Sequence, residues 1–186
     1  MIKSLVAFCT LVFISTSANA TTHLAPLTGL DLRSGQRFTQ ITDPKTKATV
    51  IVFLSARCPC SSSHEAALKS LFNQFSTQGF QFIGIHSNAD EPVQESQEHF
   101  VKAALPFPVI QDNAAQLADQ FKALKTPHVF ILNSQGETLF QGGVDDSHIA
   151  ATAKKHYLDE ALAALSQGNL PPQKEVRTVG CVIKRP

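Results

Sequence analysis

The chain has 186 residues, of which 43% are hydrophobic and 17% are charged. That composition is typical of a folded globular protein and excludes a disordered chain. The 16 basic and 15 acidic residues nearly balance, so no basic block is present to bind nucleic acid or an anionic membrane. The length suits one domain with short extensions.

Residues 1–20 have the pattern of a secretory signal peptide. Lys3 supplies a positive start, the apolar stretch LVAFCTLVFI follows, and Ala18-Asn19-Ala20 provides the small residues of a cleavage site. The apolar stretch is short for a membrane anchor, and no later stretch approaches a spanning length. We therefore expect cleavage after Ala20, secretion across the inner membrane into the periplasm, and no membrane span afterwards.

Beyond residue 29, apolar patterns and turn residues predict alternating strands and helices. The continuous apolar run at 48–54 suits a central strand that is covered on both faces. Apolar residues at helical spacing, ended by a glycine, predict helices over 61–79 and 156–168. The other expected elements are a weak hairpin within 30–47, a strand at 80–87, a helix within 91–105, a short strand at 107–110, a helix at 113–124 and a hairpin at 125–143.

Strands that alternate with helices, followed by a hairpin and a last helix, predict an α/β fold with a mixed central sheet and helices on both faces. We assign residues 21–170 to this domain and residues 171–186 to a C-terminal tail that carries Cys181. In the helix at 113–124, Leu117, Phe121 and Leu124 are expected to share one face, with Asp112 or Asn113 as its cap.

Cysteines are the residues best suited to carry chemistry. Once residues 1–20 are removed, Cys58, Cys60 and Cys181 remain, and an odd number of cysteines cannot all pair within one chain. Cys58 stands where a strand gives way to a helix, so the free amides and the dipole of that helix favour its thiolate. We therefore predict that Cys58 is a nucleophile, with Pro59 holding the turn in shape and Arg57 close enough to assist.

The strand that leads into Cys58-Pro59, and the Thr126-Pro127 pair before the later hairpin, resemble the thioredoxin fold. More closely, the order and spacing of several stretches resemble the redoxin or peroxiredoxin-like (AhpC/TSA-type) proteins that bacteria export. These stretches are FPVIQD, TPHVFIL, GGVDD, YLDEALAALSQG and VGCVIK. The resemblance covers about residues 25–184. It implies a thioredoxin-like three-layer sandwich, a thiol–disulfide oxidoreductase and no cofactor.

The resemblance also implies roles for particular residues. Pro127 would be a cis-proline, and Thr126 before it would pair with a substrate strand. Cys181 or Cys60 would resolve a bond formed at Cys58, so the candidate catalytic residues are Cys58, Cys60, Cys181, Thr126 and Pro127. The expected partners are protein thiols and disulfides, or small thiols and peroxides.

The sequence departs from the Cys-x-x-Cys motif of thioredoxins. Ser61 occupies the place of the second cysteine, and Cys60 comes one position too early. A direct Cys58–Cys60 bond would close a tight, strained ring that is easily reduced. The three cysteines could also serve only to fasten the tail, although one bond would still leave one thiol over.

Three other functions stay open on the sequence alone. A thiol peroxidase fits the resemblance, but such enzymes carry a threonine two or three positions before the reactive cysteine, where this chain has Ala56 and Ser55. A copper(I)-binding or delivery protein would use Cys58, Cys60 and His64, because His64 follows Cys60 by one helical turn. The third is an inactive redoxin domain used for interaction.

Other histidines and a carboxylate pair have simpler interpretations. His128, at the start of a buried strand, could add a copper ligand or pack in the core. The other histidines, which show no ligand spacing, are predicted at the surface: His86, His99, His148 and His156. Asp145-Asp146 are expected to cap the segment that follows them.

Overall fold

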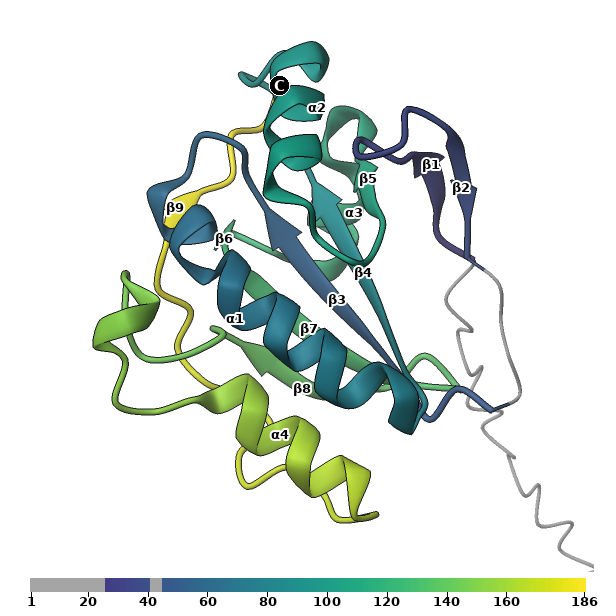
Figure 1. Ribbon diagram of the computed structural model, residues 1–186, viewed down its shortest axis with the longest axis vertical. Coiled ribbons are helices and arrows are strands. Elements are labelled where there is room, and N and C mark those ends of the chain that lie inside the picture. Colours follow the sequence, from purple (N-terminus) through teal and green to yellow (C-terminus); the bar gives the residue numbers. More distant parts are fainter. Residues whose placement is uncertain (1–25, 41–44) are drawn as a thin grey trace, which may run out of the picture.

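The structure is a computed structural model and describes residues 26–40 and 45–186. The predicted signal peptide at 1–20 lies outside these residues. A five-stranded sheet forms the centre of the molecule (Figure 1). Its strands, in sheet order, are β5 (Val109–Gln111), β4 (Phe80–His86), β3 (Ala48–Leu54), β7 (His128–Asn133) and β8 (Thr138–Gly142). β3, β4 and β5 run parallel, whereas β7 and β8 are antiparallel to their neighbours, so the sheet is mixed as predicted.

The central strand β3 occupies the residues predicted for it and is buried along its whole length. Its side chains alternate between two hydrophobic clusters because successive residues of a strand point to opposite faces. Val50 and Val52 belong to one cluster, and Ile51 and Phe53 to the other. The sheet therefore has a packed core on each face.

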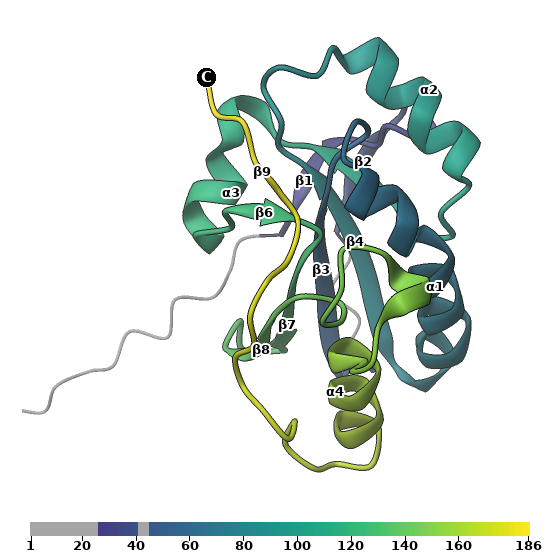
Figure 2. The same ribbon diagram turned by 90° about the vertical axis from the view of Figure 1, so that its left-hand side faces the viewer.

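Helices cover both faces of the sheet. α1, α2 and α4 pack on the Val50 side, and α3 packs on the Ile51 side. Figure 2 shows α1 and α4 on one side of the sheet and α3 on the other, which confirms the three-layer sandwich. The helices are α1 (Pro59–Phe75), α2 (Val93–Ala103), α3 (Gln116–Phe121) and α4 (Tyr157–Ser166), with short 3-10 turns at Ser76–Gln78, Asn113–Ala115 and Ala150–Thr152.

The helix expected at 113–124 is shorter than predicted. The N-cap of α3 is Ala115 and not Asp112, but the Asp112 carboxylate oxygens accept the first-turn amides of Leu117 and Ala118, each at 3.0 Å. However, α3 ends at Phe121, and the chain leaves the helix at Lys122, whose φ is 54°. The expected shared face was therefore wrong for Leu124, whose side chain lies beyond the helix and is 62% exposed.

Two small two-stranded sheets complete the fold. β1 (Thr28–Leu30) and β2 (Arg37–Thr39) form the predicted weak hairpin, which begins two residues earlier than expected. After α4 the tail returns along the domain, where β9 (Cys181–Val182) pairs antiparallel with β6 (Lys125–Thr126), as Figures 1 and 2 show. This pairing sets the tail beside the start of α1. None of the described helices combines the length and the apolar character that crossing a bilayer requires.

Candidate active site

Cys58 is the N-cap of α1. Its backbone is extended, with φ −83° and ψ 114°, and Pro59 takes the first position of the helix. Proline suits that position because its missing amide would have no partner there. The Ser61 amide, in the same first turn, points at the Cys58 sulfur with 3.4 Å between N and Sγ. The helix thus presents a backbone donor to Cys58, as expected from its place at the junction, although the side chain is only 2% exposed.

The second wall of the site is the Thr126–Pro127 segment. The peptide bond between these residues is cis, as the resemblance implied. The carbonyl oxygen of Thr126 accepts a hydrogen bond from the Cys58 thiol, with 3.2 Å between Sγ and O. The backbone edge of Thr126, expected to pair with a substrate strand, pairs in this structure with Cys181 of the chain's own tail.

Gly180 allows the tail to come this close. A Cβ atom at Gly180 would lie 2.0 Å from the Thr126 carbonyl oxygen, well inside any allowed contact. Only a glycine fits between the tail and β6 at this point. The residue therefore sets how near Cys181 can lie to the start of α1.

The three cysteines predicted as catalytic come together. All are free thiols, and the Sγ atoms of Cys58, Cys60 and Cys181 lie within 4.8 Å of one another. Cys58 and Cys60 are buried, whereas Cys181 is partly exposed. Two distant segments of the chain thus place three sulfur atoms in one cluster.

The environment separates the acidities of the three thiols. Burial favours the neutral form of Cys58, but hydrogen bonds from the Cys181 thiol and the Ser61 amide help to outweigh it and lower the pKa of Cys58 to about 7. Burial and the Cys58 sulfur raise the pKa of Cys181 to about 12. Burial and the charge at Cys58 also raise the pKa of Cys60. The cluster therefore carries its first negative charge on Cys58.

His148 is exposed, as predicted, but its ring also reaches the cluster. Its Nδ1 atom is 3.4 Å from the Cys60 sulfur. His148 lies on the loop after β8, far from Cys60 in the sequence. Spacing along the chain therefore could not indicate that the two side chains meet. His86 was also predicted at the surface, yet it is fully buried and its Nε2 atom lies 3.0 Å from the Glu91 carboxylate.

His64 was weighed as a copper ligand with Cys58 and Cys60, and the structure contradicts that arrangement. The His64 side chain is buried, with Nδ1 2.6 Å from the Cys60 carbonyl oxygen and Nε2 3.0 Å from Asp145. Both ring nitrogens therefore already face oxygen acceptors. Within the described part of the chain, the cluster with metal-binding geometry contains Cys181 in place of His64.

Asp145 also caps its own turn, as predicted, because its carboxylate accepts the Ser147 amide at 2.8 Å.

His128, the other histidine considered for copper, is not part of the sulfur cluster. Burial lowers its pKa to about 4, and its ring packs on Phe130 with 4.5 Å between ring centroids. Core packing, the simpler interpretation, therefore describes it better.

The loop before Cys58 is fastened by Glu91, a residue the sequence analysis missed. The buried carboxylate accepts the Ser55 hydroxyl at 2.5 Å, the Ala56 amide at 2.8 Å and the Arg57 amide at 3.3 Å. Burial alone would raise the pKa of Glu91, but hydrogen bonds from His86, Ser55 and the Ala56 amide keep it below the ordinary value. Glu91 follows β4, and Cys58 follows the parallel strand β3. Because parallel strands end at the same edge of a sheet, the sequence could have indicated that Glu91 lies near Cys58.

Arg57 does not assist the thiol. Its guanidinium points to Glu95 on α2, with 2.8 Å between Nε and Oε1, and donates to the Asp90 carbonyl at 3.0 Å. The side chain is exposed. The lowered pKa of Cys58 comes from its hydrogen bonds and not from this charge.

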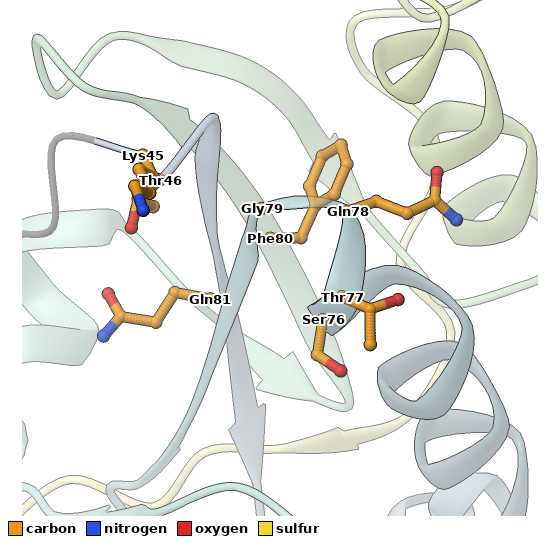
Figure 3. Close-up of a pocket in the computed structure, with 8 residues that line it drawn as sticks. All are labelled: Lys45, Thr46, Ser76, Thr77, Gln78, Gly79, Phe80 and Gln81. Atoms are coloured by element: carbon orange, nitrogen blue, oxygen red, sulfur yellow. The ribbon is translucent and has the colours of Figure 1, made fainter.

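A polar pocket lies at the opposite end of the sheet, where β4 begins. Figure 3 shows its side chains on the turn after α1, at the start of β4 and in the loop before β3. The lining residues are Lys45, Thr46, Ser76, Thr77, Gln78, Gly79, Phe80 and Gln81. Since the cysteines lie beyond the carboxyl ends of β3 and β4, this pocket is no part of the sulfur cluster.

Curated relatives with named activities match about half of the chain. The sporulation thiol-disulfide oxidoreductase A of Bacillus subtilis is 24% identical over 94 residues, which are 50% of this chain and 57% of that protein. The thiol-disulfide oxidoreductase ResA of Halalkalibacterium halodurans is 24% identical over 91 residues, 49% of this chain and 51% of that protein. The chain thus spans little more than half the length of these relatives.

Solved structures match more of the chain. An uncharacterized conserved protein of Geobacillus kaustophilus has a TM-score of 0.75 at 28% identity, covering 87% of this chain and 89% of its own. A hypothetical protein of Sinorhizobium meliloti has a TM-score of 0.77 at 23% identity, covering 92% and 97%. The thioredoxin domain of a Bacteroides vulgatus thiol-disulfide oxidoreductase has a TM-score of 0.52 at 18% identity, covering 66% and 86%. The fold is thioredoxin-like.

The family is shown by a match that runs from the N-terminal hairpin through most of the central sheet. It covers residues 22–139, and so includes β3, the Cys58 turn and the Thr126–Pro127 segment. This chain belongs to the AhpC/TSA family.

Proposed function

We propose that the protein is an exported thiol–disulfide oxidoreductase in which Cys58 is the nucleophile and Cys181 is the resolving thiol. The observation that carries this proposal is the gathering of three free thiols within 4.8 Å, one of them at the N-terminus of a helix. The lowered pKa of Cys58 supports its role, since a thiolate is the attacking form.

Cys181 is the better resolving partner than Cys60. The β6–β9 register sets Cys181 opposite Thr126, whose carbonyl contacts the Cys58 sulfur. Cys60 lies on the same helix turn as Cys58, and its sulfur is close to His148. A Cys58–Cys181 bond joins two segments across a strand pairing, whereas a Cys58–Cys60 bond would strain a short ring.

Two exchange steps complete a reduction. The Cys58 thiolate attacks one sulfur of a substrate disulfide, forms a Cys58–substrate bond and releases the other sulfur as a thiolate that takes up a proton. Cys181 then loses its proton and attacks the Cys58 sulfur. The second substrate thiol leaves with a proton, and a Cys58–Cys181 disulfide remains. The substrate gains two electrons and the protein loses two, and the reverse sequence oxidises a dithiol.

Electrostatics supports this order of steps. The Cys58 sulfur contributes to the raised pKa of Cys181 through a hydrogen bond and through charge. Once Cys58 is bonded to substrate, it carries no charge, so the pKa of Cys181 falls and its thiolate forms more easily. Cys181 is thus held back until the first step has taken place.

A peroxidase is less well supported. Ser55 stands at one of the two positions where a peroxidase would carry its threonine, but its hydroxyl is buried and donates a hydrogen bond to Glu91. The other position is Ala56, which has no polar side chain. Neither residue offers a free hydroxyl to polarise a peroxide.

Protein substrates suit the surface next to the cluster. Three exposed apolar side chains stand close in sequence to site residues: Leu124, Ile149 and Val182. Exposed apolar groups beside a reactive thiol favour a polypeptide over a small polar molecule. We place the protein in the periplasm because of the signal pattern at residues 1–20.

Disulfide mapping tests the proposal. The reduced protein is treated with glutathione disulfide, blocked with an alkylating reagent, digested and analysed by mass spectrometry. We expect a Cys58–Cys181 link and an alkylated Cys60. In Cys181→Ser, glutathione should remain attached to Cys58. A Cys58–Cys60 link would contradict the resolving role of Cys181, and three alkylated thiols would contradict the exchange activity.

A further inference from the structure

We propose that Cys58, Cys60 and Cys181 in their reduced form bind one copper(I) ion through three sulfur atoms. The geometry is the first support. Metal–sulfur bonds of about 2.3 Å in a flat trigonal site separate the sulfurs by about 4 Å. The three Sγ atoms already lie within 4.8 Å of one another, so a small closure of the cluster would seat an ion.

The donor set is the second support. Among the described residues, the set of ligand atoms that all lie within 4.8 Å of one another contains the three sulfurs and no carboxylate or imidazole atom. Soft thiolate donors favour Cu(I) and zinc over magnesium, calcium or manganese. Structural zinc takes four protein ligands, and the fourth candidate, His148, approaches only the Cys60 sulfur, at 3.4 Å. A three-sulfur set therefore suits Cu(I) better than zinc.

The surroundings of the cluster favour its charge. Three thiolates around one monovalent ion leave a net negative charge, and binding releases the thiol protons to solvent. The cluster lies at the N-terminus of α1, where the helix dipole and free amides stabilise negative charge. Cys58 and Cys60 are buried and Cys181 is partly exposed, so an ion can enter from the tail side and then be shielded.

The site differs from the exchange reaction in its redox state. A Cys58–Cys181 disulfide removes two of the three ligands, so the oxidised protein should not hold the ion. Copper in turn should protect all three thiols from alkylation. The metal site needs the third sulfur, Cys60, which the exchange steps do not use, and this separates the two proposals.

The test uses the complete purified protein, reduced and kept free of oxygen. Copper(I) is supplied as its acetonitrile complex against the chelator bathocuproine, and the loaded protein is examined by X-ray absorption. We expect one ion per chain with three sulfur neighbours. No bound copper in competition, or an ion with two sulfur neighbours, would overturn the proposal. Zinc is titrated in parallel, and tighter zinc than copper binding would also overturn it.

Variants at adjacent helix positions sharpen the test. Cys60→Ser should weaken copper binding by more than the roughly 10- to 100-fold that loss of an outer-shell partner costs. Ser62→Ala, at an exposed position in the same turn, is the matched control and should bind as the parent does. If Cys60→Ser binds copper(I) as tightly as the parent does, Cys60 is not a ligand and the three-sulfur site is wrong. Disulfide mapping of the wild-type protein distinguishes the two proposals. A Cys58–Cys181 link without copper binding rejects only the copper site. Copper binding without that link rejects only the proposed exchange reaction.

Discussion

The two segments that meet at the sulfur cluster are held by different kinds of contact. The start of α1 is fixed from several sides: Glu91 holds the loop before it, the Ser61 hydroxyl accepts the Ser55 amide, and His64 joins the helix to Asp145. The tail is held at Cys181 by a two-residue strand on β6, and beyond it by the buried Ile183 and by Arg185, whose guanidinium donates to Asp119 at 2.6 Å. The proposed nucleophile is thus buried within the central domain, whereas its partner is partly exposed on a short strand of the tail.

This difference has a chemical meaning. A nucleophile is most useful when its position and its pKa are fixed, because both depend on nearby groups. A resolving thiol must approach after substrate has bonded to Cys58, so a partly exposed position beside Cys58 suits it. The tail also occupies the Thr126 edge that the sequence analysis expected a substrate to use. Cys181 is therefore placed as a substrate cysteine would be, and an extended substrate that uses this edge must displace β9.

The largest expected effect comes from removing the two thiols in turn. Cys58→Ser retains a side chain that can cap α1 but loses the nucleophile, so disulfide reduction should fall by about a thousandfold or more. Cys181→Ser retains the first step and should slow turnover by a smaller factor. Reduction of a disulfide-linked fluorescent peptide, with glutathione as the electron source, measures both. Equal losses would mean that the two segments do not have separate roles.

A second test detaches the tail without altering a sulfur atom. In Gly180→Ala the new methyl group meets the Thr126 carbonyl oxygen, so β9 must move away from β6. We expect formation of the Cys58–Cys181 disulfide to slow by roughly tenfold to a hundredfold, because small misplacements of reacting groups are costly. Stopped-flow oxidation by glutathione disulfide, followed by mass mapping, gives the rate.

The matched control for this tail variant is Lys184→Ala, which changes an exposed side chain of the same tail. It should oxidise at the parent rate. If Gly180→Ala also oxidises at the parent rate, the β6–β9 pairing does not position Cys181.

The pH dependence of alkylation compares the two thiols directly. Since the pKa of Cys58 is lowered to about 7, its rate should rise with pH and reach half of its maximum near pH 7. A free cysteine does so near pH 8.5. Cys181, whose pKa is raised to about 12, should react little below pH 10 in chains whose Cys58 is still unlabelled. Iodoacetamide labelling, read at each cysteine by mass spectrometry, measures both profiles.

Two variants at Cys181 identify the cause of the Cys58 shift. The hydrogen bond from Cys181 is the largest of the contributions that lower the pKa of Cys58. Cys181→Ala removes that donor and should move the Cys58 midpoint upward, whereas Cys181→Ser keeps a hydroxyl donor and should move it less. A midpoint that stays near pH 7 in Cys181→Ala would assign the shift to the helix alone.

The sequence predicted those parts of the site that lie within one strand–turn–helix unit. β3, the Cys58 turn and α1 follow from local apolar patterns and from Pro59. The cis bond before Pro127 came from the family resemblance. The contacts of Glu91, His148 and Asp145 were missed because they depend on how loops fold back over the sheet. Leu124 was misplaced because helical spacing alone cannot show that the chain leaves its helix at Lys122.

The smallest expected effect concerns the loop that fixes Cys58. Glu91→Gln keeps the shape of the side chain but replaces one acceptor oxygen with an amide group that faces backbone donors. Leaving buried donors unpaired should lower the free energy of unfolding by about 1–3 kcal/mol. Urea denaturation measures this change, and the alkylation midpoint of Cys58 shows whether the loop still positions the sulfur.

Glu95→Gln is the matched control, because Glu95 pairs with the same Arg57 from an exposed position on α2. An exposed ion pair adds little to stability, so this variant should unfold as the parent does and leave the Cys58 midpoint unchanged. If Glu91→Gln behaves like Glu95→Gln, the buried carboxylate does not hold the loop. The position of the Cys58 sulfur would then depend on α1 and the β6 segment alone.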